Sequence, residues 1–197
     1  MTQLSISTIT PLKVGLRFHA FMLLNATIVA IGKGEYVELV QTNGITIKAR
    51  LSVTAARQLG HQSKVWRVSL HFRTDQQGNL IEPIFLQRIR PHQAEQDSST
   101  IWSVAGEITF LEPRQRIMTI KIYPEREERK PFFVSVCLDL EQYELAKSAT
   151  CIQASGDLLE KKLIAKKLEV IDLKIPSNWQ QQNQRRLVKR LRNNHSS

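Results

Sequence analysis

The chain is poor in cysteine and has no long apolar run, and each shortage excludes a class of protein. Its two cysteines, Cys137 and Cys151, have no CxxC partner and fall in strand-like segments, as expected of small buried side chains in a reducing compartment. The longest apolar stretch, residues 20–31, is shorter than the roughly 20 residues that cross a bilayer. The first twenty residues also lack the compact apolar run of a secretion signal. We therefore expect a cytoplasmic protein without a membrane span.

Signals of catalysis are also missing from the sequence. The five histidines show no metal-ligand spacing, and Gly32-Lys33-Gly34 lacks the context of a phosphate-binding loop. The acidic pair Glu127-Glu128 lies among Arg126, Arg129 and Lys130, which is typical of a charge-balanced hairpin tip. We therefore predict that the chain is not an enzyme and has no catalytic residue, bound metal or cofactor.

The charge is strongly positive and unevenly placed. The 28 Lys and Arg residues outnumber the 18 Asp and Glu residues, for a formal net charge of +10. Residues 1–90 carry +7 and residues 177–197 carry +5, whereas residues 101–176 are neutral. This asymmetry indicates that the first half and the tail face a polyanion.

A polar segment, residues 91–100, separates two stretches of regular hydrophobic pattern. It begins with Pro91 and contains no branched aliphatic residue, as is typical of a linker. The predicted organisation is an N-terminal extension (1–13), a basic unit (14–90), the linker (91–100), a second unit (101–176) and a basic tail (177–197).

The first half is predicted to form three strands, a short helix and two more strands. Asn43-Gly44 is a strong tight-turn signal, and Ser52 is suited to cap the helix. In the fourth strand Trp66, Val68, Leu70 and Phe72 alternate inward with Arg67, Ser69, His71 and Arg73 outward. The segments are 16–31, 35–41, 45–51, the helix 52–60, and then 64–73 and 80–90.

The second half repeats the same order of elements. Gly106 lies within its first strand, where a glycine often marks a bulge, and Asp139 with Gln142 forms a capping-box pattern at the helix. The segments are 101–111, 116–123, 131–138, the helix 139–147, and then 150–158 and 163–173.

Five strands with a helix between the third and fourth match the OB-fold, a five-stranded Greek-key barrel. A further likeness to a known family rests on two segments of the second unit. They are Val104-Ala-Gly-Glu-Ile-Thr-Phe and Leu163-Ile-Ala-Lys-Lys-Leu-Glu-Val-Ile. With these segments, residues 101–173 resemble the OB-fold nucleic-acid-binding family that includes the anticodon-binding domains of some aminoacyl-tRNA synthetases. No synthetase catalytic domain accompanies them. The predicted fold class is therefore all-β, with two OB-fold barrels in tandem and a basic C-terminal tail.

OB-folds bind single strands through cations that follow the phosphates and aromatic rings on which bases stack. In the first unit the outward candidates are Tyr36 on the second strand, Lys48 and Arg50 on the third, and Arg67, His71 and Arg73 on the fourth. An ordinary solvated sheet face is the alternative interpretation of this set.

In the second unit Met118, Ile120 and Ile122 are expected to face inward, which leaves Lys121 and Tyr123 outward beside Phe133. This trio is a candidate stacking surface, although Phe133 is equally suited to pack against the other unit or a partner. In the tail, cations surround an apolar helical face that would fold on a polyanion; they are Arg185, Arg186, Lys189, Arg190 and Arg192.

These observations predict a protein that binds single-stranded nucleic acid, DNA or RNA, with little dependence on base sequence. The first unit and the tail would supply electrostatic attraction, and the second unit would supply stacking. The alternative is an adaptor or assembly factor whose barrels dock on a partner protein.

Overall fold

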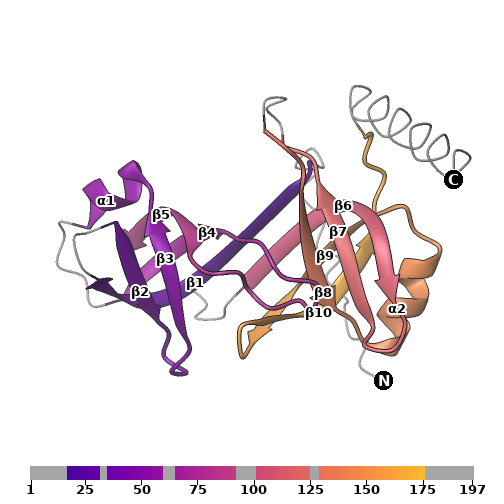
Figure 1. Cartoon of the computed structure of the whole chain (residues 1–197), viewed down its shortest axis with the longest axis horizontal. Coiled ribbons are helices and arrows are strands. Elements are labelled where there is room, and N and C mark those ends of the chain that lie inside the picture. Colours follow the sequence, from indigo (N-terminus) through magenta and orange to yellow (C-terminus); the bar gives the residue numbers. More distant parts are fainter. Residues whose placement is uncertain (1–16, 32–34, 60–64, 92–100, 125–128, 176–197) are drawn as a thin grey trace, which may run out of the picture.

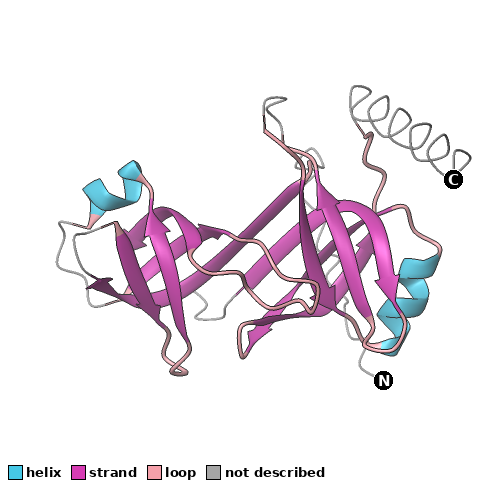
Figure 2. Cartoon of the chain, viewed as in Figure 1, coloured by secondary structure: helices cyan, strands magenta, loops and turns pink. Residues whose placement is uncertain are grey.

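The computed structural model describes residues 17–31, 35–59, 65–91, 101–124 and 129–175 (Figures 1 and 2). Within these residues the chain forms mainly strands, with one short helix in each half. In order along the chain they are β1 (His19–Ile31), β2 (Tyr36–Val40), β3 (Thr46–Leu51), α1 (Val53–Gln58), β4 (Trp66–His71), β5 (Ile84–Pro91), β6 (Ile101–Glu112), β7 (Ile117–Ile122), β8 (Phe132–Cys137), α2 (Leu140–Lys147), β9 (Cys151–Leu159) and β10 (Lys162–Val170).

Strands β1 to β5 close into a five-stranded barrel, called here the N-terminal barrel. β1 pairs with β2, β2 with β3, β3 with β5, β5 with β4, and β4 again with β1. Only the β3–β5 contact is parallel. The predicted β class and the closed five-stranded barrel are confirmed.

Strands β6 to β10, called here the C-terminal unit, pair in the same cyclic order. β6 contacts β7 and β9, β7 contacts β8, and β10 contacts β9 and β8. The parallel contact between β8 and β10 consists of one residue pair, Cys137 with Ile164. The two strands therefore diverge beyond that pair.

Alternation of apolar and polar residues decides which side chains face inward. Trp66, Val68, Leu70 and Phe72 are buried as expected, and the same is true of Ile120 in the second half. Burial of this kind stabilises the fold by about 1.5–3 kcal/mol for each large apolar side chain.

Polar side chains set the starts of both helices, as expected from the sequence. Ser52 accepts a hydrogen bond from the backbone N–H of Ala55 (3.0 Å), and Asp139 forms a complete capping box with Gln142. In the described part of the chain, neither helix has the length and apolar character that a membrane crossing requires.

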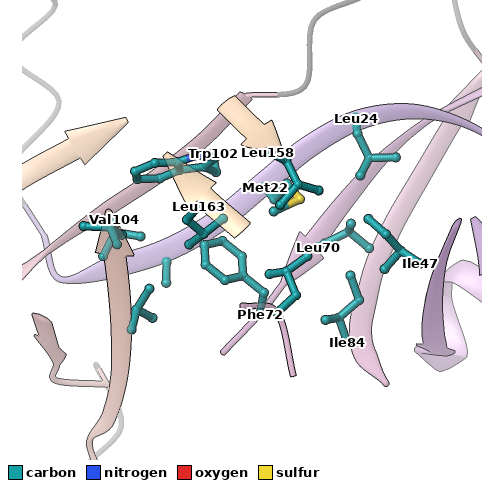
Figure 3. Packing of buried hydrophobic residues seen from close by; sticks show 14 of the residues in the cluster. Met22, Leu24, Ile47, Leu70, Phe72, Ile84, Trp102, Val104, Leu158 and Leu163 are labelled. Carbon is teal, nitrogen blue, oxygen red and sulfur yellow. The ribbon is translucent and has the colours of Figure 1, made fainter. Parts of the chain in front are cut away.

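The two halves share one sheet and one core. The start of β1 pairs with the start of β6, from His19 with Ala105 to Leu23 with Ile101, so that all ten strands form a continuous sheet. Figure 3 shows the Phe72 ring next to Leu163 and Met22 next to Leu158, so side chains of both halves meet in one buried cluster. β5 ends at Pro91 and β6 begins at Ile101, and the rest of the predicted linker lies outside the described residues.

The connection between β4 and β5, residues 72–83, lies against the C-terminal unit and is called here the β4–β5 loop. The Thr74 hydroxyl donates to the Ser135 carbonyl (3.2 Å) and accepts from the Ser135 backbone N–H (2.5 Å). The backbone N–H of Leu80 donates to Lys161 (2.8 Å), and that of Leu163 donates to Gly78 (3.1 Å). The loop is therefore hydrogen-bonded both to β8 and to the β9–β10 turn, close to the place where β8 and β10 diverge.

A close backbone approach explains one glycine of the C-terminal unit. A Cβ atom at Gly156 would collide with the carbonyl oxygen of Ile164 and lie 2.7 Å from the backbone nitrogen of Lys166. β10 carries a register shift opposite this position. Any larger residue at position 156 must displace backbone.

Candidate nucleic-acid interface

Four outward side chains of the N-terminal barrel lie in one row across four neighbouring strands. Tyr36 on β2 pairs with Arg50 on β3, Arg50 pairs with Phe85 on β5, and Phe85 pairs with His71 on β4. Because adjacent strands are about 4.8 Å apart, the row is about 14 Å long. We call these four residues the outer stripe.

The outer stripe combines aromatic rings with a cation, because Arg50 lies between Tyr36 and Phe85. The side chain of Phe85 is 43% exposed, and its ring stacks beside that of His71 with centroids 6.5 Å apart. At the other end, the Lys48 Nζ lies 5.5 Å from the centre of the Tyr36 ring. The stripe therefore offers flat apolar surfaces with cations next to them, which suits stacked bases joined by phosphates.

Acidic neighbours reduce the positive charge at the β2–β3 end of the stripe. Arg50 lies 4.0 Å from the Glu35 carboxylate, and Lys48 lies opposite Glu38 across the strand pair. Each of these cations therefore has an acid beside it, which lowers the net positive charge of the face formed by β2 and β3.

Arg67 is also separated from the other predicted cations. It is half-buried and donates to the Asn25 side-chain oxygen (3.2 Å), and it pairs with Arg90 across the β4–β5 strands. Its outward position is as predicted, but the structure groups it with Arg90 and Arg88 rather than with the outer stripe.

The predicted trio of the C-terminal unit is divided. Phe133 is 49% exposed and pairs with Lys121, as expected. Tyr123, in contrast, is only 2% exposed, because Phe18 packs against its ring edge-to-face (5.0 Å) and its hydroxyl donates to Glu107 (2.5 Å). The prediction of an outward Tyr123 is wrong. Lys121 lies 4.6 Å from the centre of the Tyr123 ring and pairs with Glu107 across the strands, so Phe133 is the accessible ring of the predicted trio.

A groove of about 1040 Å³ lies where the N-terminal barrel meets the C-terminal unit. We call it the junction groove. The outer stripe runs into it, since Phe85 and His71 belong to both, and Phe21 and Phe132 add rings from β1 and β8. Three cations line it, and they are Arg73, Arg129 and Lys130.

The sequence reasoning missed Phe85, Phe21 and the two cations before β8. Phe85 stands between the buried Ile84 and Leu86, so strand alternation alone marks it as outward. The tail residues Arg185, Arg186, Lys189, Arg190 and Arg192 lie outside the described residues.

This chain resembles a solved structure in fold. That solved structure is the crystal structure of a deletion mutant of the single-stranded DNA binding protein from Thermus aquaticus. The likeness has a TM-score of 0.51 at 16% sequence identity and covers 81% of this chain and 98% of that one. It supports an OB-fold β-barrel for this chain. No protein-family model and no curated protein matches the sequence.

Proposed function

We propose that this chain is a non-enzymatic protein that binds single-stranded nucleic acid, and that it does so with two OB-folds in tandem. The outer stripe is the observation that carries the proposal. The shared cyclic strand order of the two halves and the fold likeness to a single-stranded DNA binding protein support it.

The chemistry of the stripe favours single strands over duplexes. The exposed ring of Phe85 and the half-buried ring of Tyr36 can stack only on bases that are already unpaired, and each stacked base contributes about 1–3 kcal/mol. Every base has a flat face, so such binding depends little on sequence. The stripe therefore suits a ligand recognised by its single-stranded state.

Electrostatic attraction supplements stacking in this proposal. Arg73 at the start of the β4–β5 loop lies close to the stripe, and the five cations of residues 185–192 add charge from the tail. Each phosphate neutralised on a single strand adds about 0.7 to the steepness of the dependence of log affinity on log salt.

A titration of the full chain with a labelled 30-nucleotide dT strand tests the proposal. We expect binding at 50 mM salt that weakens at 200 mM, and weaker binding of a duplex of the same length. The double variant Tyr36→Ala, Phe85→Ala should bind at least tenfold more weakly, since two stacking surfaces are lost. The matched control is Val29→Ala with Val53→Ala, two exposed apolar residues outside the stripe. No binding by the wild type, or equal affinity of the stripe variant and the control, refutes the proposal.

The alternative is an adaptor that docks on a partner protein. Exposed apolar side chains on the C-terminal unit, among them Phe110, Leu140 and Leu145, favour it. The same titration separates the two functions, because an adaptor would bind the dT strand no better than a duplex.

A further inference from the structure

We infer that the junction groove is itself a binding site for single-stranded nucleic acid. The groove holds bases and phosphates of the strand where the strand passes from the N-terminal barrel to the C-terminal unit. This inference rests on the proposed function and adds the path that the strand takes. It places the crossing on the side of the barrel formed by β1, β4 and β5.

The walls of the groove present rings from both halves of the molecule. Phe21 on β1, His71 on β4 and Phe85 on β5 come from the N-terminal barrel, and Phe132 on β8 comes from the C-terminal unit. The volume of about 1040 Å³ is at the upper end of the range for small-molecule sites, so it has room for more than one base.

The charges of the groove favour an anionic occupant. Arg73 lies with its guanidinium carbon 5.4 Å from the centre of the Phe132 ring, so one cation sits directly beside a stacking surface. Arg129 and Lys130 are exposed where the chain enters β8. Glu82 is the one carboxylate among the described lining residues, and its Oε1 forms an ion pair with the Lys161 Nζ (2.7 Å).

The groove is held in place before any ligand arrives. The first residues of β1 line the groove and pair with β6, and the β4–β5 loop is fixed to β8 through the two hydrogen bonds of Thr74 with Ser135. Phe72, at the start of this loop, is buried in the shared core. A preformed site loses less conformational entropy on binding than one that must assemble.

Rings beside cations, in a groove continuous with the outer stripe, match the alternating bases and phosphates of a single strand. A strand that follows the stripe from Tyr36 to His71 reaches the groove, because His71 and Phe85 belong to both surfaces. Continuity of the two surfaces and charge complementarity therefore identify the occupant as the same strand.

Protection of a single thiol tests the location. Cys137→Ser and Cys151→Ala remove the native thiols, and Ile81→Cys then places one in the groove wall at a position that is 50% exposed. Val53→Cys in the same background places the control thiol on α1. With saturating dT strand, the Ile81→Cys variant should react with a thiol reagent at least tenfold more slowly, and the Val53→Cys variant at an unchanged rate.

A charge variant tests the energetics. Arg129→Ala with Lys130→Ala should lower the salt slope by about 1.4 and weaken binding about 25-fold at 0.1 M salt, if each cation neutralises one phosphate. The matched control is Arg114→Ala with Lys174→Ala, which removes two exposed cations outside the groove lining. An equal effect of the two double variants overturns the inference.

The results of these experiments distinguish failure of the groove assignment from failure of the proposed function. If the wild type binds no dT strand, the proposed function fails. A different result would overturn the groove assignment alone. In that result the wild type binds the dT strand and the stripe variant loses affinity, but the Ile81→Cys thiol is no better protected than the Val53→Cys thiol. A peptide rich in Asp and Phe is the corresponding probe for a protein partner. If this peptide and not the dT strand slows the reaction of the Ile81→Cys thiol, the groove is a protein-docking site and the inference is overturned.

Discussion

Replacing Phe85 by alanine should weaken nucleic-acid binding without changing its dependence on salt. Phe85 lies at the centre of the outer stripe, between Arg50 and His71, and it is 43% exposed. Loss of one stacked base costs about 1–3 kcal/mol, which corresponds to about 5- to 150-fold in the dissociation constant. No charge is removed, so the slope of log affinity against log salt should stay at the wild-type value.

The charged neighbour gives the contrasting result. Arg50→Ala should lower the salt slope by about 0.7 and weaken binding about fivefold at 0.1 M salt, if Arg50 neutralises one phosphate. The Glu35 carboxylate, 4.0 Å away, would make the loss smaller.

Fluorescence anisotropy with a labelled dT strand at several salt concentrations measures both quantities. Phe85→Leu is the informative control, because leucine keeps apolar bulk and lacks the flat π surface. Stacking predicts that the leucine variant binds almost as weakly as the alanine variant. A Phe85→Ala variant with wild-type affinity, or one that changes the salt slope as Arg50→Ala does, would refute the reasoning.

Three further predictions concern stability and can be measured by chemical denaturation. Gly156→Ala should destabilise the protein by about 1–3 kcal/mol, because the added methyl group meets backbone atoms of β10; an unchanged midpoint would contradict this. Asp139→Ala should cost about 0.5–2 kcal/mol through loss of the capping box at α2, whereas Asp139→Asn should lose much less. Burial lowers the pKa of His19 below its ordinary value near 6.5, although a hydrogen bond to the Arg17 carbonyl partly opposes the shift. The unfolded chain therefore binds the proton more readily, so the free energy of unfolding should fall as the pH drops below about 6.5. His19→Gln should flatten this fall between pH 7.5 and 5.5.

Local sequence signals predicted most of the barrel. The alternation around Val68 and Leu70 identified the inward face of β4, and Asn43-Gly44 marked the turn between β2 and β3. These signals succeed because strand alternation and turn conformation depend on residues close together in the chain.

The errors arose from contacts between distant segments. Tyr123 has the spacing of an outward residue, yet Phe18, more than a hundred residues earlier, covers its ring. Ser135 lies two residues after the exposed Phe133 and so occupies the same face of β8, yet Thr74 of the β4–β5 loop covers it. A periodic pattern describes which face of a strand a residue occupies, but not what another part of the chain places on that face.

The local balance of charge also depends on contacts that the sequence does not show. Summing charge over residues 1–90 ignores which acids lie beside which cations, and Glu35 and Glu38 lie beside Arg50 and Lys48. The junction groove was not predicted, because it combines short segments from β1, β4, β5 and β8 that only the fold brings together.

The pairing of β1 with β6 should hold the two halves of the molecule together even without a covalent connection between them. Five residue pairs join these strands, and the buried cluster draws side chains from both halves. A protein cut between Pro91 and Ile101 would keep all of these contacts, so the two fragments should remain associated. For the intact chain, the same continuity implies that melting occurs as one cooperative event rather than as two successive ones.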